Sequence, residues 1–232
     1  MLAGGIAVRW SFLALGLTVW LLSLVACEGK EGVREIAGTT IELPVPRTSG
    51  PVPLERALAE RRSVRAFTDE PLSLEELSQL LWSAQGITAG WGGRTAPSAG
   101  ALYPLEVYAV TPQGLYRYVP EGHRALLLAT GDLRSALAGA ALEQEAVRDA
   151  PTVLVIAAVF ERTEVKYGAR AERYVHLEAG HAAQNVLLQA VGLNLGAVPI
   201  GAFSDRDVQR ILGLPRDHAP LYLIPVGHPA PE

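Results

Sequence analysis

Hydrophobic residues recur at helical spacing in several stretches of this chain. Ser73, with Glu76 three residues later, forms a capping-box pattern before one apolar stripe, and Gly86 follows it as a stop. A longer stripe over about 171–191 repeats at intervals of three and four residues and is largely alanine. We therefore predict helices between Ser73 and Gly86 and over 171–191, and further helices over 54–62, 132–148 and 205–212.

Other apolar runs predict strands. The run Val153–Phe160 is apolar throughout, which indicates a strand buried on both faces. Further strands are expected over 105–110, 115–119, 195–200 and 221–226, with a tight hairpin around Pro112-Gln113-Gly114. Strands mixed with helices in this way predict an α+β sandwich, in which helices flank a mostly antiparallel central sheet. The first strand is not followed by the G-x-G-x-x-G pattern of a dinucleotide-binding fold.

The N-terminal part of the chain has a different character. Trp10–Cys27 is an uncharged run that follows Arg9 and ends in Leu-Val-Ala-Cys, which is the architecture of an export signal. The ending resembles a bacterial lipoprotein box, so we expect lipidation of Cys27 and a protein that is exported and anchored to the bilayer. The alternative is an uncleaved membrane helix, since the run is near the lower limit of roughly 17–25 residues.

Residues 28–53 contain four Pro and four Gly without a regular pattern, which predicts a flexible tether. The folded domain is then expected over 54–228, followed by a short tail over 229–232.

Composition excludes several classes of function. The net charge is −4, so the chain has no basic excess for nucleic acid. Cys27 is the only cysteine, which excludes an internal disulfide and a cysteine metal cluster. His176 and His181 are five residues apart and do not share a helix face, so we interpret them as packing or interface residues and predict no metal site.

An arginine cluster lies at the end of the first predicted helix. Three guanidinium groups surround Ser63 and repel one another unless an anion joins them. A phosphate would satisfy them through charge-assisted hydrogen bonds, with the Ser63 hydroxyl as a further donor. The alternative is a solvated helix end that is neutralised by Glu55, Glu60 and the helix dipole. The cluster consists of Arg61, Arg62 and Arg65.

Two segments of small residues are candidate ligand contacts. The loop Pro97–Ala101 has backbone amides that can approach a bound group, although small residues also make ordinary tight turns. In the second segment, Pro199 removes an amide and Gly201 lets the backbone approach a planar ligand. This second segment can equally be a strand end that turns before the helix at Asp205.

Together these segments resemble the flavin-dependent nitroreductase family. The stretches RRSVRAF, APSAGALYPLEVY, HLEAGHAAQNVLLQAVGLNLG and AVPIGAF occur in the family's order and cover most of 54–228. SAGALYP and the KYGxR-like stretch Lys166–Arg170 resemble the branch whose members oxidise azoline rings to thiazoles and oxazoles in modified peptides. The resemblance implies a nitroreductase fold, an FMN cofactor at a subunit interface, and a homodimer whose core contains the alanine-rich helix.

The resemblance also implies roles for individual residues. Lys166 and Tyr167 resemble a catalytic pair near the flavin, and such a pair suits the proton that accompanies hydride removal from carbon. They can alternatively form a charged surface turn closed by Gly168. The phosphate and ribityl contacts would come from Arg61, Arg62, Ser63 and Arg65. The ring contacts would come from Pro97, Ser98, Ala99, Gly100 and Ala101, partly across the interface, and from Pro199, Ile200 and Gly201.

The chain departs from the family pattern at three places. Ala101 stands where many nitroreductases have an amide side chain, and Gly201 stands where they have a glutamate. The sequence ends in Pro229-Ala230-Pro231-Glu232 where the family often has a basic segment, so phosphate binding would depend on the early arginines.

We expect an FMN-dependent oxidoreductase that moves hydride or electrons between a reduced donor, which is a nicotinamide, a quinone or a protein, and an organic substrate. The alternative is a membrane-anchored flavin-binding or ligand-binding protein with the same fold and no catalytic activity.

Overall fold

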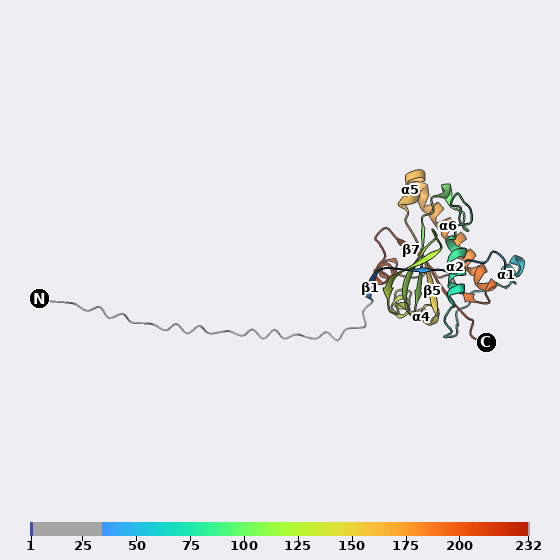
Figure 1. Cartoon of the computed structure of the whole chain (residues 1–232), viewed down its shortest axis with the longest axis horizontal. Helices are drawn as coiled ribbons and strands as arrows, with labels where there is room; N and C mark the ends of the chain where they lie inside the picture. The colour runs from blue at the N-terminus through green and yellow to red at the C-terminus, as the bar shows by residue number, and fades with distance from the viewer. Residues whose placement is uncertain (2–33, 232) are drawn as a thin grey trace. The chain divides into compact units, whose positions relative to one another are not determined.

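Seven strands form one sheet in which every neighbouring pair is antiparallel, in the order β1-β4-β3-β2-β5-β7-β6 (Figure 1). The computed structural model describes Met1 and residues 34–231, so residues 2–27 of the predicted signal segment 1–27, Cys27 included, lie outside the described residues. The strands are β1 (Arg34–Glu42), β2 (Leu105–Thr111), β3 (Gly114–Val119), β4 (Arg124–Thr130), β5 (Thr152–Ala158), β6 (Gly196–Ala197) and β7 (Ala219–Gly227).

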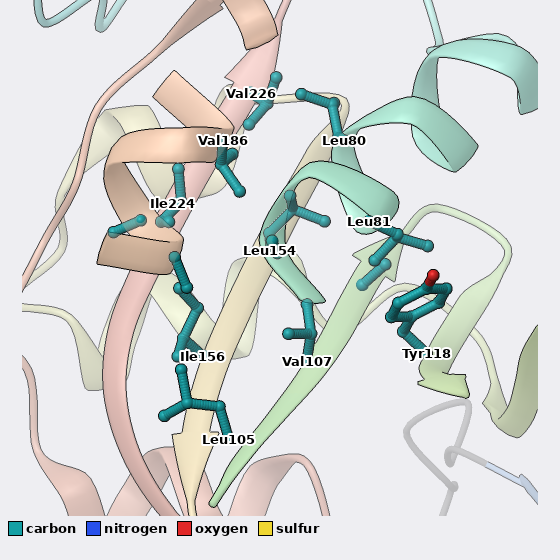
Figure 2. Close-up of a cluster of buried hydrophobic side chains, with 14 of the residues drawn as sticks. Leu80, Leu81, Leu105, Val107, Tyr118, Leu154, Ile156, Val186, Ile224 and Val226 are labelled. Carbon is teal, nitrogen blue, oxygen red and sulfur yellow. The ribbon is translucent and has the colours of Figure 1, made fainter. Parts of the chain in front are cut away.

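Helices cover both faces of this sheet. One face packs against α2 and α6, and Figure 2 shows Leu81 of α2 and Val186 of α6 beside Leu154 of β5. The other face packs against α3, α4 and α7. The α-helices are α1 (Leu54–Glu60), α2 (Leu74–Gln85), α3 (Arg134–Ala140), α4 (Glu145–Asp149), α5 (Glu161–Tyr167), α6 (Ala171–Gly192) and α7 (Asp205–Ile211). Short 3₁₀ helices are η1 (Ala99–Ala101) and η2 (Gly168–Arg170).

The predicted α+β sandwich is confirmed, and much of its local structure follows the sequence pattern. Ser73 accepts a hydrogen bond from the Glu76 amide, and the Glu76 carboxylate accepts one from the Ser73 amide, which forms the predicted capping box. Strand β5 is buried along its whole length, as the apolar run predicted. The predicted hairpin is present, with Thr111 paired to Gly114.

Several boundaries differ from the prediction. The helix expected over 132–148 is two helices, because Leu142 and Glu143 take positive φ values of 58° and 57° and interrupt it. The strand expected over 195–200 is reduced to β6 and a single bridge between Ile200 and Leu223. Strands β1 and β4 and helix α5 were not predicted.

The prediction of a flexible tether over 28–53 is wrong for residues 34–47. Strand β1 pairs with β4 at one edge of the sheet, and Leu43 is buried. The Arg47 amide donates to Gln79 Oε1 at 2.8 Å, and Gln79 Nε2 donates to the Arg47 carbonyl oxygen at 3.0 Å. These long-range partners hold a segment whose own composition resembles a linker.

The expected tail also belongs to the domain. The Thr68 amide donates to the His228 carbonyl oxygen at 2.9 Å, and the Ala230 amide donates to the Ala66 carbonyl oxygen at 3.0 Å. The C-terminal residues therefore lie beside the segment that follows the arginine cluster. Among the helices within 34–231, none has the length and hydropathy that a membrane-spanning helix requires.

Candidate functional site

The arginine cluster lies beside the segment that leads into the turn at 199–201. The two are far apart in the sequence, since the paired residues Ser63 and Ala197 are separated by 134 positions. Ser63 forms a parallel bridge with Ala197, and the Val64 amide donates to the Ala197 carbonyl oxygen at 3.1 Å. Gly196 allows this approach, because a Cβ there would lie 2.5 Å from Val64 Cγ1. The fold thus joins two of the predicted ligand segments along one backbone contact.

The three arginines of this cluster have different surroundings. Arg62 Nη1 donates to the carbonyl oxygens of Ala59 and Arg61 at 2.9 and 2.8 Å, so it caps the end of its own helix. Among the described residues, no carboxylate lies within 4.0 Å of Arg61 or Arg65. Glu60, the expected neutralising group, pairs instead with Arg56 at 2.7 Å. Within this cluster, Arg61 and Arg65 are therefore the cations that an anion could bind.

The turn at 199–201 presents its glycine to solvent and keeps its isoleucine in the core. Ile200 is buried, and both its amide and its carbonyl oxygen hydrogen bond to Leu223, at 2.8 and 2.9 Å. Gly201 is exposed, and no atom lies within 4 Å of the position that a Cβ would occupy. Ligand contacts from this turn would come from Pro199 and Gly201, while Ile200 supports the turn from behind.

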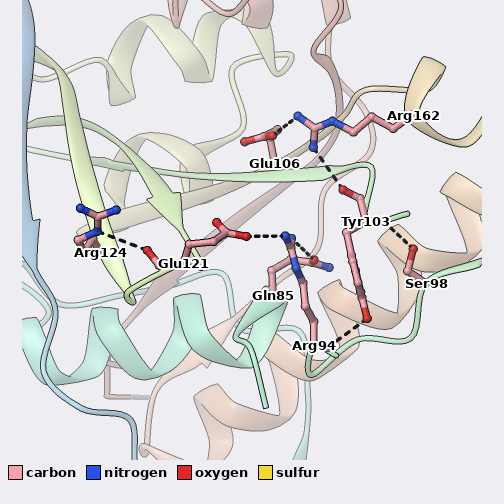
Figure 3. Close-up of polar contacts among 8 residues, drawn as sticks. All are labelled: Gln85, Arg94, Ser98, Tyr103, Glu106, Glu121, Arg124 and Arg162. Carbon is pink, nitrogen blue, oxygen red and sulfur yellow. Dashed lines mark hydrogen bonds and ion pairs between the residues drawn. The ribbon is translucent and has the colours of Figure 1, made fainter. Parts of the chain in front are cut away.

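The loop Pro97–Ala101 is held in a strained conformation. Gly100, Ala101 and Tyr103 have φ values of 64°, 53° and 45°, a region that costs energy for residues with a side chain. The Tyr103 amide donates to Ser98 Oγ at 2.9 Å, and Arg162 Nη1 donates to the Tyr103 carbonyl oxygen at 3.2 Å (Figure 3). Strain held by surrounding contacts in this way is common at functional sites.

The predicted catalytic pair lies directly against this loop. A Cβ at Gly100 would lie 2.9 Å from Lys166 Nζ and 3.0 Å from the Tyr167 hydroxyl. Lys166 is exposed and its Nζ lies 5.5 Å from the centre of the Tyr167 ring. Tyr167 makes an edge-on contact with Tyr174 of α6, with ring centres 4.9 Å apart. A side chain at position 100 would require these polar groups to shift, so the fold brings together two predicted parts of the site.

Sequence reasoning missed a buried acid beneath the same loop. Glu178 of α6 is 2% exposed, and burial raises its pKa to about 7. The neighbouring Ser98 hydroxyl, Arg94 guanidinium and Gln85 amide lower the pKa less than burial raises it. The sequence held an indication of this group, because Glu178 lies on the three- and four-residue spacing of the buried stripe of α6, between Val175 and Ala182.

The two groups of candidate residues lie toward opposite ends of α6. Glu178 and the loop above it are near the N-terminal end, while the arginine cluster pairs with β6, which follows the C-terminal end. Gly192 lies fourteen positions after Glu178, a distance of about 21 Å along the helix at roughly 1.5 Å per residue. A cavity of about 420 Å³ between residues 47–54, α2 and α6 contains none of the predicted site residues.

Comparisons with known proteins agree with this architecture. The nitroreductase family profile matches residues 58–228. A nitroreductase-like protein of Methanocaldococcus jannaschii is 45% identical over 196 residues, which cover 82% of this chain and 98% of that protein. An FMN reductase [NAD(P)H] of Bacillus subtilis is 27% identical over 189 residues, which cover 75% of this chain and 65% of that protein.

A solved structure supports the same assignment. The crystal structure of a nitroreductase-like protein from Ralstonia eutropha matches with a TM-score of 0.76 and 35% sequence identity. The match covers 88% of this chain and 97% of the Ralstonia eutropha chain. The antiparallel seven-stranded sheet with helices on both faces is thus the nitroreductase fold. The chain belongs to the nitroreductase family, whose members are oxidoreductases.

Proposed function

We propose that this protein is an FMN-dependent oxidoreductase that acts as a homodimer and moves hydride or electrons between a reduced donor and an organic substrate. The observation that carries the proposal is the contact of Lys166 and Tyr167 with Gly100 in the strained loop. It places two proton-carrying side chains beside backbone that is free of side-chain bulk. Positioned side chains of this kind suit the proton transfer that accompanies hydride transfer at a bound cofactor.

The donor set fits the two ends of FMN. Arg61, Arg65 and the exposed Ser63 hydroxyl can hold a phosphate, because the two guanidiniums have no carboxylate partner among the described residues. Gly201 and the loop Pro97–Ala101 offer backbone to the ring. When bound, FMN supplies the hydride-accepting and hydride-donating chemistry. The printed name of the Bacillus subtilis relative, an FMN reductase, supports this choice of cofactor.

The separation of the two groups favours a site shared between subunits. If the α6 helices of two protomers pair in opposite directions, the loop Pro97–Ala101 of one protomer faces the arginine cluster of the other. The alanines of α6 are buried against the chain's own sheet and α2, so contacts between protomers from this helix would come from its exposed face. Leu177, which is 51% exposed on the same helix, is a candidate for the contact between protomers.

Lys166 and Tyr167 have separate tasks in this proposal. The exposed Lys166 ammonium donates or stabilises charge at the substrate, and the half-buried Tyr167 hydroxyl takes or returns the proton that accompanies hydride transfer. Because this pair also resembles that of azoline-oxidising relatives, a ring that loses hydride and a proton is one substrate class to test.

The visible spectrum of the purified full-length protein tests the cofactor. We expect flavin absorption with about one FMN released per protomer on denaturation. A colourless protein that takes up no added FMN contradicts the proposal.

Anaerobic mixing then identifies the donor. NADH, NADPH and a reduced quinone are added separately to the flavin-loaded protein, and bleaching of the flavin is followed. Bleaching that persists in K166A and Y167F, with turnover lost, supports the assigned roles. Bound flavin that no donor reduces and no substrate reoxidises favours the non-catalytic binding protein instead.

A further inference from the structure

A second cavity lies where two neighbouring strands of the sheet separate. The pairing of β2 with β3 ends at Tyr108 and Arg117, so within the described residues Leu105–Val107 of β2 pair with β5 alone. The cavity has a volume of about 240 Å³ and is lined by Leu105–Val107 on one side and by Tyr118–Glu121 on the other. At roughly 30 Å³ for one water, this volume holds about eight non-hydrogen atoms. Its size therefore suits a small molecule.

Three buried hydrogen-bond donors line this cavity. Arg94 Nε, Arg117 Nε and Gln85 Nε2 are buried and have no hydrogen-bond partner among the described residues. These nitrogens donate and do not accept, so a ligand that satisfies them must present acceptor atoms. Buried polar groups without a partner are rare in folded proteins, because each costs the free energy of a lost hydrogen bond. The donors therefore favour a ligand rich in oxygen.

The charge of the lining favours an anion over a neutral ligand. Three arginines and two glutamates line the cavity, which leaves one positive charge in excess. Arg162 pairs with Glu106 at 2.5 Å. Arg94 pairs with Glu121 at 3.4 Å. In the part of the chain that the structure describes, no carboxylate lies within 4.0 Å of Arg117, so the excess charge lies at this residue.

The second arginine, Arg94, is held mainly by neutral groups. Its Nη1 donates to Gln85 Oε1 at 3.0 Å, and its Cζ lies 4.5 Å from the centre of the Tyr103 ring (Figure 3). Its ion pair with Glu121 is weak, because the Glu121 side chain is 66% exposed to water. A guanidinium that is already fixed loses little freedom when it binds an anion.

We propose that this cavity is a binding site for a small oxyanion, a carboxylate or a phosphate, that is held by Arg117 and Arg94. Both groups present several oxygens, which a guanidinium can bind with two parallel hydrogen bonds. Neither the cations Arg61 and Arg65 nor the loop Pro97–Ala101 line this cavity, so the site is separate from the proposed cofactor site. The proposal does not depend on the proposed function.

The site adjoins the residue that follows the strained loop. The Arg94 amide donates to the Tyr103 hydroxyl at 3.3 Å, and Arg162 Nη1 donates to the Tyr103 carbonyl oxygen at 3.2 Å. Both arginines line the cavity. We therefore expect a bound anion to alter the surroundings of Tyr103 as well as those of the cavity itself.

Amide NMR of the purified protein tests the site. Sodium phosphate and sodium acetate are added in separate titrations, with sodium chloride holding the ionic strength constant. We expect saturable shifts of the Val107, Val119 and Tyr103 amide resonances, and the salt that saturates at the lower concentration identifies the anion class. Phosphate can also bind at the arginine cluster, where it would shift residues 61–65 and 199–201. Shifts confined to those residues, or no saturation with either salt, overturn the proposal.

Three variants assign the binding to individual groups. R117A should weaken the affinity by about ten-fold or more, because it removes a charge-assisted partner. E121Q should strengthen it by about two- to five-fold, because it removes a carboxylate that competes for Arg94, and a misfolded protein would not show this gain. R206A, on the exposed side of α7, is the charge-matched control and should leave the affinity unchanged. Equal losses in R117A and R206A, or no loss in R117A, contradict the proposal.

Discussion

The residues near the two ends of α6 differ in backbone strain, burial and charge. Near its N-terminal end, three features cost free energy. The loop Pro97–Ala101 has left-handed backbone, and the buried Glu178 carboxyl has an oxygen without a partner among the described residues. The polar ends of Lys166 and Tyr167 lie close to Gly100. Beyond its C-terminal end, the backbone of Val64 is paired with Ala197, and strain is absent from the described φ values of 61–65 and 196–201. The first end holds strained backbone and a buried acid, while the second is a regular support for Arg61 and Arg65, which have no carboxylate partner among the described residues.

This difference indicates a division of labour. A regular backbone with exposed cations can hold an anion with little rearrangement, which suits the phosphate end of a cofactor. Strained backbone and a carboxyl with a raised pKa are typical of places where charge and protons move. Substitutions at the two ends should therefore have different effects on FMN affinity, turnover and stability.

The largest effect is expected at the regular end. Replacing both Arg61 and Arg65 with alanine removes the two charge-assisted partners of the phosphate, each of which contributes about 1.5–3 kcal/mol. FMN affinity should fall by roughly 10²- to 10⁴-fold while the folded protein remains intact. Fluorescence titration with FMN measures the loss, and R62A, whose guanidinium caps α1, is the matched control. Equal losses in R62A and in the double variant would assign the effect to the helix end.

A second change tests the backbone contact at that end. In G196A, the new methyl group would lie 2.5 Å from Val64 Cγ1, so β6 and the arginine cluster must separate. We expect a loss of about 1–3 kcal/mol in the free energy of unfolding and weaker FMN binding together. G50A, where no atom lies within 4 Å, should change stability by less than about 0.5 kcal/mol in the same urea titration.

A third change separates strain from crowding at the other end. Both Gly100 and Gly213 have left-handed φ values, 64° and 58°, but only Gly100 has neighbours within 4 Å of a Cβ. G100A and G213A should both lose about 1 kcal/mol of stability from backbone strain. G100A alone should also lower turnover, because the methyl group displaces Lys166 and Tyr167. Unchanged turnover in G100A would remove this pair from the reacting centre.

The fourth prediction concerns stability against pH. The pKa of Glu178 is raised from 4.5 to about 7 in the folded protein, so folding favours its protonated form. Stability should then decrease as pH rises from about 4.5 to 7 and remain level above. E178Q should abolish this decrease and be more stable than the unaltered protein at pH 8.5 by about 1–2 kcal/mol. The free energy of unfolding in urea is measured for both proteins at several pH values. The same pH dependence in both would show that folding does not raise the pKa of Glu178.

Much of the local structure could be predicted from the sequence because it depends on neighbouring residues. The capping box of Ser73 and Glu76 lies within one helical turn, and the apolar run of β5 needs only its own side chains. Strand β1 could not be predicted, because its partner β4 is 82 to 96 residues away along the chain, by the Glu42–Arg124 and Arg34–Thr130 pairings. The break in 132–148 depends on the positive φ of Leu142 and Glu143, which neither residue type favours.

The sequence alone determined the residue types of the candidate site: the arginines around Ser63, the small loop Pro97–Ala101 and the pair Lys166–Tyr167. The tertiary structure decided which of them can act. It turned Arg62 onto its own helix and buried Ile200, Glu178 and the alanines of α6. Hydrogen-bond partners, burial and pKa depend on neighbours far along the chain, and only the packed fold brings those neighbours into contact.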